Sequence, residues 1–394
     1  MTTYWHAEGL DLDDDPASGA AITRLTARPL TNIDIYCEQP YTSPDGLRVA
    51  YARAPSPDPR VPPYELCVID LPRLRTALIE PVVASSLVAT SSWSGLIYYL
   101  RPNNELICVD LTTLEKQIVI TDYDLPLRHL ETVSPDHRYL AGAVRLPDNT
   151  FGIARVDLKT KEYKLIYQSE ETLGHVQFNP VHGRELLVQV NRKQRYDPQT
   201  GHWHRDQVEV THIYVNTETG AVRELPVGPP HTANTCGHSA WAADSGRIGV
   251  TVNWKGMIAR KDELAAARGN LHDPRHPDGN FVTVGPDDAA PRVFKAPEHI
   301  FNHVNVSRCG DYFVADSYRN GIPGPIELVV GNIGTGKYRT LVSDCGASGG
   351  GPACSHPHPY FTADLRRVIY NSDGTGICHV HAARMTDEFL ASLE

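Results

Sequence analysis

One repeated pattern constrains the fold of this chain more than any other feature. A turn of the Ser-Pro-Asp-Gly type is followed by an apolar strand, most clearly in YTSPDGLRVAYA from Tyr41 and TVSPDHRYLAGAV from Thr132. Weaker copies begin at Ser91, Val176, Ala240, Val304 and Tyr360. Units spaced about 40 to 65 residues apart are typical of propeller blades. The seven copies therefore predict an all-β chain that folds as a seven-bladed β-propeller.

A second pattern predicts the outer hairpin of each unit. Several copies continue into a strand that ends in a turn rich in Asp, Thr and Gly, which is typical of antiparallel strands joined by a tight connection. The sequences are LICVDLTTLEK, GIARVDLKTKEYK, HIYVNTETGAV and LVVGNIGTGKY. A pair of β-sandwiches would also show short strands at a regular turn spacing, and it is the alternative fold.

The repeats leave no second domain, so residues 1–394 are predicted to form a single one. Residues 1–18 are expected to be an N-terminal tail, and AAITRLTA from Ala20 is expected to pair with the last blade. Two stretches are typical of helices. One is an Ala-rich insertion in the fifth blade at about 258–271. The other is the C-terminal segment 386–394, for which Thr386 is a suitable N-cap.

Composition narrows the classes of function. Apolar residues make up 41% of the chain, enough for a large core, and the net charge of −10 argues against a nucleic-acid surface. No window reaches the roughly 18 apolar residues of a membrane helix. The acidic start lacks the features of a signal peptide, and the eight cysteines are scattered without a CxxC pair. We therefore expect a cytoplasmic protein with reduced thiols. The oligomeric state stays open, with a homodimer among the options.

The stretch CSHPHPYF contains the most informative residues. A proline after each histidine favours extended backbone at His356 and His358. Side chains two residues apart on an extended segment point the same way, so two imidazoles are expected to face one point, which suits a divalent metal. A structural or surface role for this pair is an equally good interpretation.

Histidines also precede the turn in three successive repeats, at His175, His238 and His303. Equivalent positions of propeller blades converge around the channel axis, so we expect these side chains to share one central pocket. Each of them alone is explained as well by a core histidine that bridges blades. Their combination with the His356 and His358 pair favours a functional site.

Two other motifs are interpreted as loop or tail. GASGG from Gly346 matches the nucleophile-elbow pattern, but that motif needs a strand before it and a helix after it, whereas here it stands in a Gly-rich loop. The DLDDD run near Asp11 lacks the glycine and the closing glutamate of a calcium loop, so a solvated acidic tail is the simpler interpretation.

Several of these segments together resemble one family, the oligogalacturonate lyases of polysaccharide lyase family 22. The similar segments are, in order, DPASGAAITRLT, YTSPDGLRVAYA, GHVQFNP, GHSAWAADSGR, HVNVSRCGDYFVAD and SHPHPYFTADLRRVIYNSDGTG, which cover about residues 15–380. The last segment is the most distinctive, whereas SPDG turns occur in many propellers. The resemblance implies a seven-bladed propeller that binds a divalent metal, manganese above all, and takes part in pectin degradation.

Carried over by position, the resemblance implies roles for single residues. His303, His356 and His358 would bind the metal, His238 would be the general base, and His175 would line the substrate pocket. Ala353 stands where the family has a glutamine ligand, which implies a three-histidine site completed by water or substrate.

A second departure lies at His212, where the family has an arginine that helps to neutralise the substrate. The resemblance then implies that His212 acts in catalysis in its place. Arg205 or Arg195, in the segment RKQRYDPQTGHWHRDQ, would compensate for the missing charge, Arg205 in catalysis and Arg195 in substrate binding.

The implied reaction is β-elimination across a uronic acid in a short acidic oligosaccharide. A divalent cation on the carboxylate stabilises the charge that develops, and a histidine with a pKa of about 6.5 is able to remove the proton near neutral pH. Two alternatives stay open. The first is a metal-dependent lyase, dehydratase or epimerase that acts on another acidic or keto sugar. The second is a non-catalytic, TolB-like propeller that binds partners.

Overall fold

The structure is a computed structural model, and its residues fall into two compact units. Unit 1 contains residues 1–124, 303–317 and 324–394, and unit 2 contains residues 125–302 and 318–323. The structure describes the chain apart from residues 1–2, 56–62, 86–87, 198–199, 201, 205–208, 233–234, 243–245, 253–279, 286, 319–324 and 350–355. The side chains of Arg195, residues 202–204 and Cys236 also lie outside the description.

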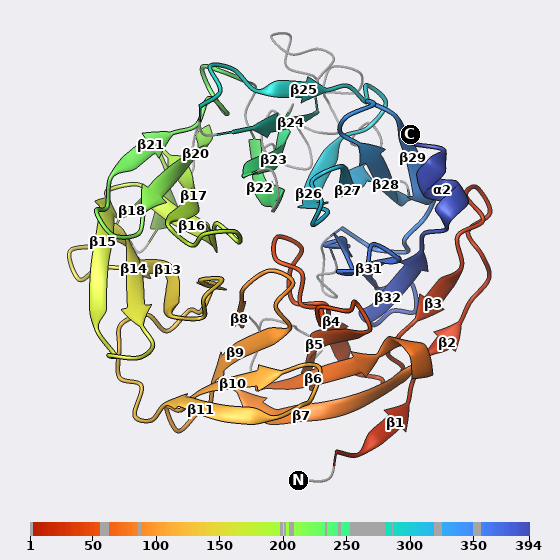
Figure 1. Cartoon of the computed structure of the whole chain (residues 1–394), viewed down its shortest axis with the longest axis horizontal. Helices are drawn as coiled ribbons and strands as arrows, with labels where there is room; N and C mark the ends of the chain where they lie inside the picture. The colour runs from red at the N-terminus through yellow and green to blue at the C-terminus, as the bar shows by residue number, and fades with distance from the viewer. Residues whose placement is uncertain are drawn as a thin grey trace. The chain divides into compact units, whose positions relative to one another are not determined.

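Unit 1 is built from antiparallel sheets in which strands consecutive in the chain are neighbours (Figure 1). One sheet contains β4 (Thr31–Ile33), β5 (Arg48–Ala54), β6 (Tyr64–Asp70), β7 (Arg75–Val83) and, at its edge, β1 (Trp5–Ala7). The short helix η1 (Leu71–Arg73) joins β6 to β7. The next meander contains β8 (Ala89–Thr90), β9 (Leu96–Leu100), β10 (Leu106–Asp110) and β11 (Lys116–Ile120).

Two further sheets of unit 1 contain the C-terminal part of the chain. One is formed by β26 (Phe301–Val306), β27 (Tyr312–Tyr318), β28 (Ile326–Asn332) and β29 (Tyr338–Val342), of which Phe301, Asn302 and Tyr318 belong to unit 2. The other is formed by β30 (Tyr360–Phe361), β31 (Arg367–Ser372), β32 (His379–Arg384), β3 (Ile22–Arg24) and β2 (Leu10–Asp11).

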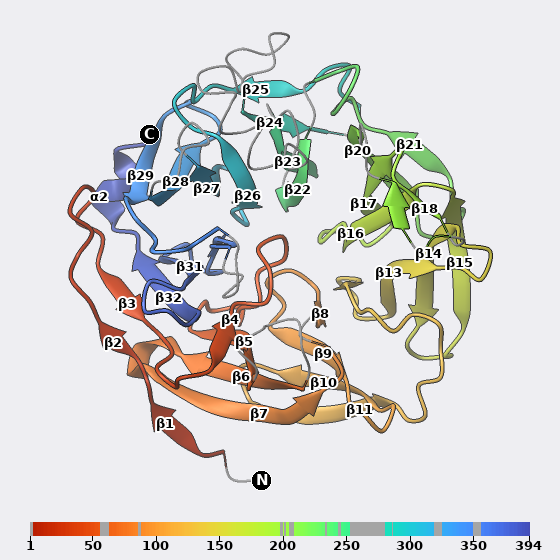
Figure 2. The ribbon, with the colours of Figure 1, turned by 180° about the vertical axis from the view of Figure 1, so that it is seen from behind.

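Unit 2 repeats the same antiparallel pattern (Figure 2). Its first meander contains β12 (Thr132–Val133), β13 (Tyr139–Arg145), β14 (Phe151–Asp157) and β15 (Tyr163–Ser169). A sheet of β16 (Thr172–Phe178), β17 (Glu185–Arg192), β20 (Glu209–Asn216) and β21 (Val222–Glu224) follows, with the hairpin β18 (Arg195–Asp197) and β19 (His202–His204) between β17 and β20. The last sheet contains β22 (Thr235–Ala242), β23 (Arg247–Val252), β24 (Phe281–Val284) and β25 (Arg292–Phe294).

A local hydrogen-bond pattern holds the turn of the repeat between the first two strands of a sheet. In the first copy the Ser43 hydroxyl donates to the Asp45 carboxylate and accepts the backbone N–H of Arg48. The same acceptor role belongs, in other copies, to the hydroxyls of Ser134, Ser307 and Thr362. These bonds span only a few residues, so the sequence determines them locally. The predicted turn positions are confirmed at these copies.

The outer hairpins have a second local pattern. Asp110 Oδ1 accepts the backbone N–H groups of Thr112 and Thr113, which closes the turn between β10 and β11. Equivalent turns join β14 to β15, β20 to β21 and β28 to β29 through Asp157, Asn216 and Asn332. These are the four hairpins that the Asp, Thr and Gly pattern predicts.

The inner strands are apolar on both faces because each sheet packs on both sides. On β5 the side chains of Ala50 and Ala52 lie in one hydrophobic core, and those of Val49 and Tyr51 lie in another. Successive residues of a strand point to opposite faces, so alternate residues enter alternate cores. This explains why the strand reads as a continuous run of apolar residues rather than an alternating one.

The two ends of the chain lie in unit 1. Residues 22–24 of β3 pair with residues 381–383 of β32, which confirms the predicted pairing of the Ala20 segment with the last unit. The C-terminal helix α2 (Asp387–Ala391) begins after Thr386, whose side chain accepts the backbone N–H of Phe389, as the predicted N-cap requires. The helix predicted at about 258–271 falls wholly outside the described residues.

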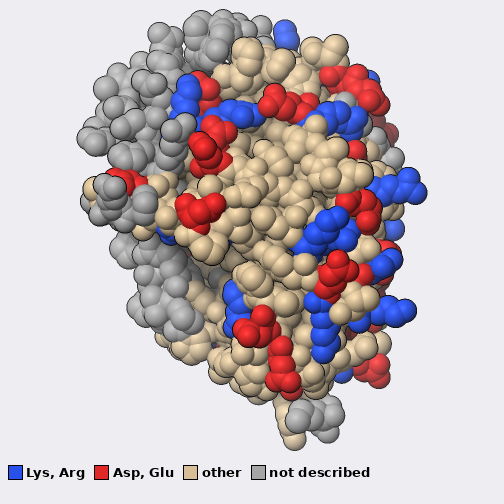
Figure 3. Space-filling model, turned by 90° about the vertical axis from the view of Figure 1, so that its left-hand side faces the viewer, with Lys and Arg blue, Asp and Glu red and all other residues tan. Residues whose placement is uncertain are grey.

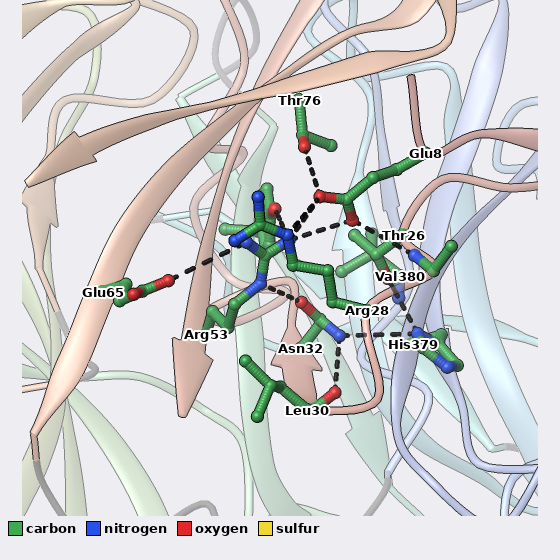
Figure 4. Close-up of polar contacts among 12 residues, drawn as sticks. Glu8, Thr26, Arg28, Leu30, Asn32, Arg53, Glu65, Thr76, His379 and Val380 are labelled. Carbon is green, nitrogen blue, oxygen red and sulfur yellow. Dashed lines mark hydrogen bonds and ion pairs between the residues drawn. The ribbon is translucent and has the colours of Figure 1, made fainter. Parts of the chain in front are cut away.

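The first residues, predicted as an N-terminal tail, pair in part with the sheets of unit 1. Strand β1 pairs with β7, and β2 pairs with β3. Between them, Glu8 is buried and meets Arg53 at 2.9 Å in a network that also contains Asn32 and Thr76 (Figure 4). Asp15 is buried as well and accepts hydrogen bonds from Ser343. Within the DLDDD run, Asp11, Asp13 and Asp14 are exposed, as the prediction of a solvated acidic segment requires, and only Asp15 is buried. The backbone and hydroxyl donors of Ser343 compensate the buried carboxylate of Asp15, and Arg53 compensates that of Glu8.

The surface and the cysteines add three observations. On the side shown in Figure 3, acidic and basic side chains are intermixed in small groups. In unit 2 the ion pair of Arg223 on β21 with Glu185 on β17 spans the strand β20 that lies between them. Among the described residues, the cysteines Cys37, Cys67, Cys108, Cys309, Cys345 and Cys378 are free thiols. No helix in the described part of the chain combines the length and apolar character that a membrane crossing requires.

Candidate functional site

His303 is fixed in place by one acidic residue. It lies on β26 and is 3% exposed, and Asp316 lies on the neighbouring strand β27 and is fully buried. Asp316 Oδ1 accepts the backbone N–H of His303 at 2.7 Å, and Asp316 Oδ2 pairs with His303 Nδ1 at 2.7 Å. The carboxylate therefore holds the proton on Nδ1 and leaves Nε2 as the ligand nitrogen, as is usual for metal-binding histidines.

The rings of His356 and His358 lie beside that of His303. The ring centroid of His303 is 5.0 Å from that of His356 and 4.3 Å from that of His358, and the last two are 5.7 Å apart. The rings of His356 and His358 are nearly parallel, at 11°, and both stand steeply across the ring of His303. The structure thus brings the three predicted metal ligands together within unit 1.

The backbone of this segment differs from the prediction. His358 has a φ of 44°, so it is not extended but lies in the left-handed region, which costs a residue other than glycine about 1–2 kcal/mol. Asn371 of β31 holds the segment from the side. Its backbone N–H donates to the Pro357 carbonyl at 2.8 Å, and its Nδ2 donates to the His356 carbonyl at 3.2 Å. Tertiary bonds therefore override the local preference of the His-Pro pair.

A loop after β4 completes the surroundings of the three histidines. The ring centroid of Tyr36 is 4.6 Å from that of His358. Burial raises the pKa of the Tyr36 phenol well above its ordinary value, and the neighbouring Glu38 raises it further. Burial likewise raises the pKa of Asp34, which is fully buried and bonded to Asn371. Tyr36 therefore keeps its phenol proton beside the imidazoles.

The spacing of the three rings fits a shared metal ion. Imidazoles bound to one ion at the usual metal–nitrogen distance of about 2.1 Å have ring centroids about 4.5–5.5 Å apart, close to the separations found here. Asp316 adds the carboxylate that commonly orients such a ligand. In the described part of the chain, however, no group of three or more His, Cys, Asp or Glu side chains is placed closely enough to hold a metal ion as the structure stands.

A second group of histidines lies in unit 2. His175 on β16 and His238 on β22 have ring centroids 5.6 Å apart, and both residues stand on the first strand of their sheets. His212 on β20 is fully buried. Burial is the largest of the effects that lower the pKa of His212 to about 3; nearby His175 also lowers it, and a backbone contact with Gly237 opposes the shift. The His212 ring is therefore neutral at physiological pH. The prediction that His175 and His238 share a pocket with His303 stays a prediction.

The surroundings of His212 explain its lack of charge. Gln189 of β17 is paired with it across the sheet, and Gly237 of β22 lies against the Gln189 amide. A Cβ at Gly237 would stand 2.5 Å from Gln189 Oε1, and the φ of this glycine is +92°, so only glycine fits there. The closely packed strands exclude water, and a buried imidazole without an acidic partner prefers its neutral form.

Three positions named from the sequence are not described. Arg205 and Ala353 lie outside the described residues. Arg195 begins β18, but its side chain is outside the description. The roles expected of Arg205 in catalysis and Arg195 in substrate binding stay predictions, and so does the loss of a glutamine ligand at Ala353.

Sequence reasoning missed the residues that support the three histidines, which are Asp34, Tyr36, Asp316 and Asn371. Asp316 left one usable signal, because an acid inside the apolar run YFVADSY is expected to need a buried partner. Nothing local singles out Asn371 or Asp34, which are joined to each other across 337 residues of chain.

Comparison with known proteins adds two relatives of matching length. The chain is 22% identical to the oligogalacturonide lyase of Pectobacterium atrosepticum and 21% identical to the oligogalacturonate lyase of Dickeya dadantii. Both alignments cover 95% of this chain and 95% of the relative. No protein-family model matches the chain.

Solved structures agree with this result. An oligogalacturonate lyase in complex with manganese superimposes with a TM-score of 0.72 at 20% identity, over 98% of this chain and 100% of that one. The oligogalacturonate lyase of Vibrio parahaemolyticus superimposes with a TM-score of 0.69 at 18% identity, over 99% of this chain and 98% of that one. A β-propeller domain from Myceliophteria thermophila superimposes with a TM-score of 0.51 at 12% identity, over 89% of this chain and 98% of that one.

The antiparallel sheets and these superpositions define the chain as an all-β protein of the β-propeller class. The predicted fold class is confirmed, while the number of blades stays a prediction. Within this class, the chain is similar over nearly its whole length to oligogalacturonate lyases, at 18–22% identity.

Proposed function

We propose that this protein is a metal-dependent lyase that cleaves short uronic-acid oligosaccharides of the oligogalacturonate type by β-elimination. The observation that carries the proposal is the convergence of His303, His356 and His358, with Asp316 behind the first of them. Similarity to oligogalacturonate lyases, one of them solved with manganese, supports the substrate class and the choice of Mn²⁺.

The three histidines would hold the ion, and the chain's own groups prepare the site for it. A divalent ion there would neutralise a substrate carboxylate and stabilise the negative charge that develops beside it. Asp316 orients His303 and keeps Nε2 unprotonated. Tyr36 packs against His358 and keeps its phenol proton, so it remains a neutral hydrogen-bond donor next to the bound carboxylate.

His238 is the proposed general base, and His175 is proposed to bind the substrate near it. A neutral imidazole is able to take the proton next to the uronate carboxylate near neutral pH. The electron pair of the broken C–H bond forms the new carbon–carbon double bond. The bond to the glycosidic oxygen breaks, and this oxygen leaves with its electron pair and takes a proton from water. Neutral His212 contributes hydrogen bonding rather than charge.

The test follows the unsaturated product by its ultraviolet absorbance. The full chain with Mn²⁺ is expected to convert digalacturonate and trigalacturonate, and His356→Ala and His238→Ala are each expected to lose the reaction. His182→Ala, at an exposed histidine of unit 2, is the matched control and is expected to keep it. No absorbance rise with any uronate oligomer, metal supplied, contradicts the proposal.

A double variant asks whether the two histidine groups act in one step. If they do, the double variant His238→Ala with His356→Ala is expected to be about as active as the less active of the two single variants. The effects of residues that act together in one step do not add. Independent, additive losses would show that His238 is not the base of the metal-assisted step.

His212 favours a second candidate, a metal-dependent lyase, dehydratase or epimerase on another acidic or keto sugar. Its buried, neutral ring stands where the resembling family has a charged arginine, so it offers no charge to a second substrate carboxylate. Arg205 and Arg195 stay proposed as replacements. Product analysis by NMR with single uronates, aldonates and keto sugars, Mn²⁺ supplied, separates the two candidates. Sugar binding without any product would instead indicate a binding propeller.

A further inference from the structure

Asn371 links strand β31, the segment that contains His356 and His358, and the loop that contains Asp34 and Tyr36. It lies on β31 and is 2% exposed. Its backbone N–H donates to the Pro357 carbonyl and its Nδ2 to the His356 carbonyl. Nδ2 also donates to Asp34 Oδ1 at 2.7 Å, and its own Oδ1 accepts the backbone N–H of Asp34 at 3.0 Å. One side chain thus bonds both the metal-ligand segment and the loop that carries Tyr36.

The bonds to the His356 segment act where the backbone is strained. His358 has a φ of 44°, a conformation that persists only when surrounding contacts over-determine it. The two bonds from Asn371 end one and two residues before His358, and the Tyr36 ring contacts the His358 imidazole. Asn371 also ties down Asp34, two residues before Tyr36, so both supports of His358 depend on it.

We infer that Asn371 is a positioning residue of the metal centre, and that its bond to the His356 carbonyl sets the angle at which His356 and His358 face His303. This inference rests on the proposed function, because it takes the three histidines to be metal ligands. Asn371 touches neither the ion nor the substrate and acts only through the backbone of the ligand segment. Losing such an outer partner typically weakens metal binding about 10–100-fold.

The experiment titrates the full chain with Mn²⁺ and follows the EPR signal of the free ion. Asn371→Ala and the equally sized Asn371→Asp, which lacks the Nδ2 donors, are each expected to bind Mn²⁺ at least about tenfold more weakly than the unchanged protein. Asn280→Ala is the matched control, since Asn280 is 1% exposed and its Nδ2 donates to two backbone carbonyls in unit 2. It is expected to lower the thermal unfolding midpoint in the same way and to leave Mn²⁺ affinity within about twofold of the unchanged protein.

An exchange of partners separates positioning from stability. In Asp34→Asn combined with Asn371→Asp, donor and acceptor change places, so the bonds between the loop and β31 re-form while the His356 carbonyl still lacks its side-chain donor. We expect the unfolding midpoint to recover and the Mn²⁺ affinity to stay weak. Recovery of both, or unchanged affinity in Asn371→Asp, would overturn the inference, and so would an equal loss of affinity in Asn280→Ala.

A second readout keeps the inference apart from the proposed function. In the metal-free protein, Asn371→Asp is expected to shift the imidazole NMR signals of His356 and His358, while Asn280→Ala leaves them in place. If the unchanged protein binds no Mn²⁺, the proposed function fails, and these signals alone decide the role of Asn371. If they do not move, the inference fails whatever the metal does.

Discussion

Two polar centres of unit 1, one built around Glu8 and the other around His303, differ in how their charges are compensated. In the first, the Arg53 guanidinium meets both carboxylate oxygens of Glu8, at 2.9 and 3.0 Å, and also donates to Asn32 (Figure 4). Burial alone would raise the pKa of Glu8, but the Thr76 hydroxyl and Arg53 together lower it below its ordinary value. In this centre the chain itself supplies both the charges and the hydrogen-bond donors that compensate them.

The second centre brings groups of the same kind together. His303, His356 and His358 place three basic rings within 5.7 Å of one another, with one carboxylate, Asp316, behind one ring. Three imidazoles have no opposite charges with which to stabilise one another. Their convergence therefore favours the binding of a cation that the chain itself does not supply. The difference suggests that the Glu8 centre holds the fold and the histidine centre binds a ligand.

The largest effect is expected from Glu8→Ala. Removing one partner of a buried ion pair leaves the other charge without compensation and costs about 3–5 kcal/mol of unfolding free energy, measured by denaturant titration. Arg28→Ala is the control, because Arg28 also pairs with Glu8 but its side chain is 44% exposed, and it is expected to cost less than about 1 kcal/mol. Equal costs for the two variants would contradict the structural role of the pair.

His356→Ala tests the other centre. Under the proposed function this variant loses one metal ligand, so activity on oligogalacturonates is expected to fall about a thousandfold, which corresponds to about 4 kcal/mol of transition-state stabilisation. The unfolding free energy of the metal-free protein is expected to change by less than about 1 kcal/mol, since this ring is only half-buried. A destabilisation as large as that of Glu8→Ala would show that the histidines serve the fold.

Adding metal compares the two centres in one experiment. Mn²⁺ at about a hundred times its dissociation constant is expected to raise the unfolding free energy by about 2.7 kcal/mol, because it binds the folded state. Arg28→Ala should keep this gain, His356→Ala should lose it, and EDTA should reverse it. A gain of the same size in His356→Ala would place the ion elsewhere.

Acid is expected to weaken the fold through histidines that lie outside the metal centre. Burial lowers the pKa of His381 on β32 to about 4, whereas an unfolded histidine titrates at about 6.5. The unfolded state therefore binds the extra proton first, so this stability is present above pH 6.5 and is lost as the pH falls toward 4. Between pH 7 and pH 5 the loss is about 2 kcal/mol for this one group.

The same unfolding titration in His381→Gln, which cannot take up the proton, is expected to show a shallower fall with pH. The pKa of His212 in unit 2 is lowered to about 3, chiefly by burial, so this residue also reduces the unfolding free energy as the pH falls. An unchanged slope in His381→Gln would show that the ring is protonated in the folded protein.

The sequence predicted those parts of the fold that rest on neighbouring residues. The turn at Ser43 and the hairpin at Asp110 were predictable because their bonds lie within a few residues. The backbone of His358 was not, because the local preference for extended structure before proline loses to bonds from Asn371. Nor was Glu8, because its cation Arg53 stands 45 residues away.

In the candidate site, too, some residues could be predicted from the sequence and others could not. Residue types and the likeness to a family pointed to His303, His356 and His358, and the folded chain does bring these rings together. The sequence by itself thus determined the repeating β units and the identity of the candidate ligands. Only the tertiary structure decided that Asp316 and Asn371 hold those ligands, because their bonds join strands and loops whose meeting depends on how whole sheets pack.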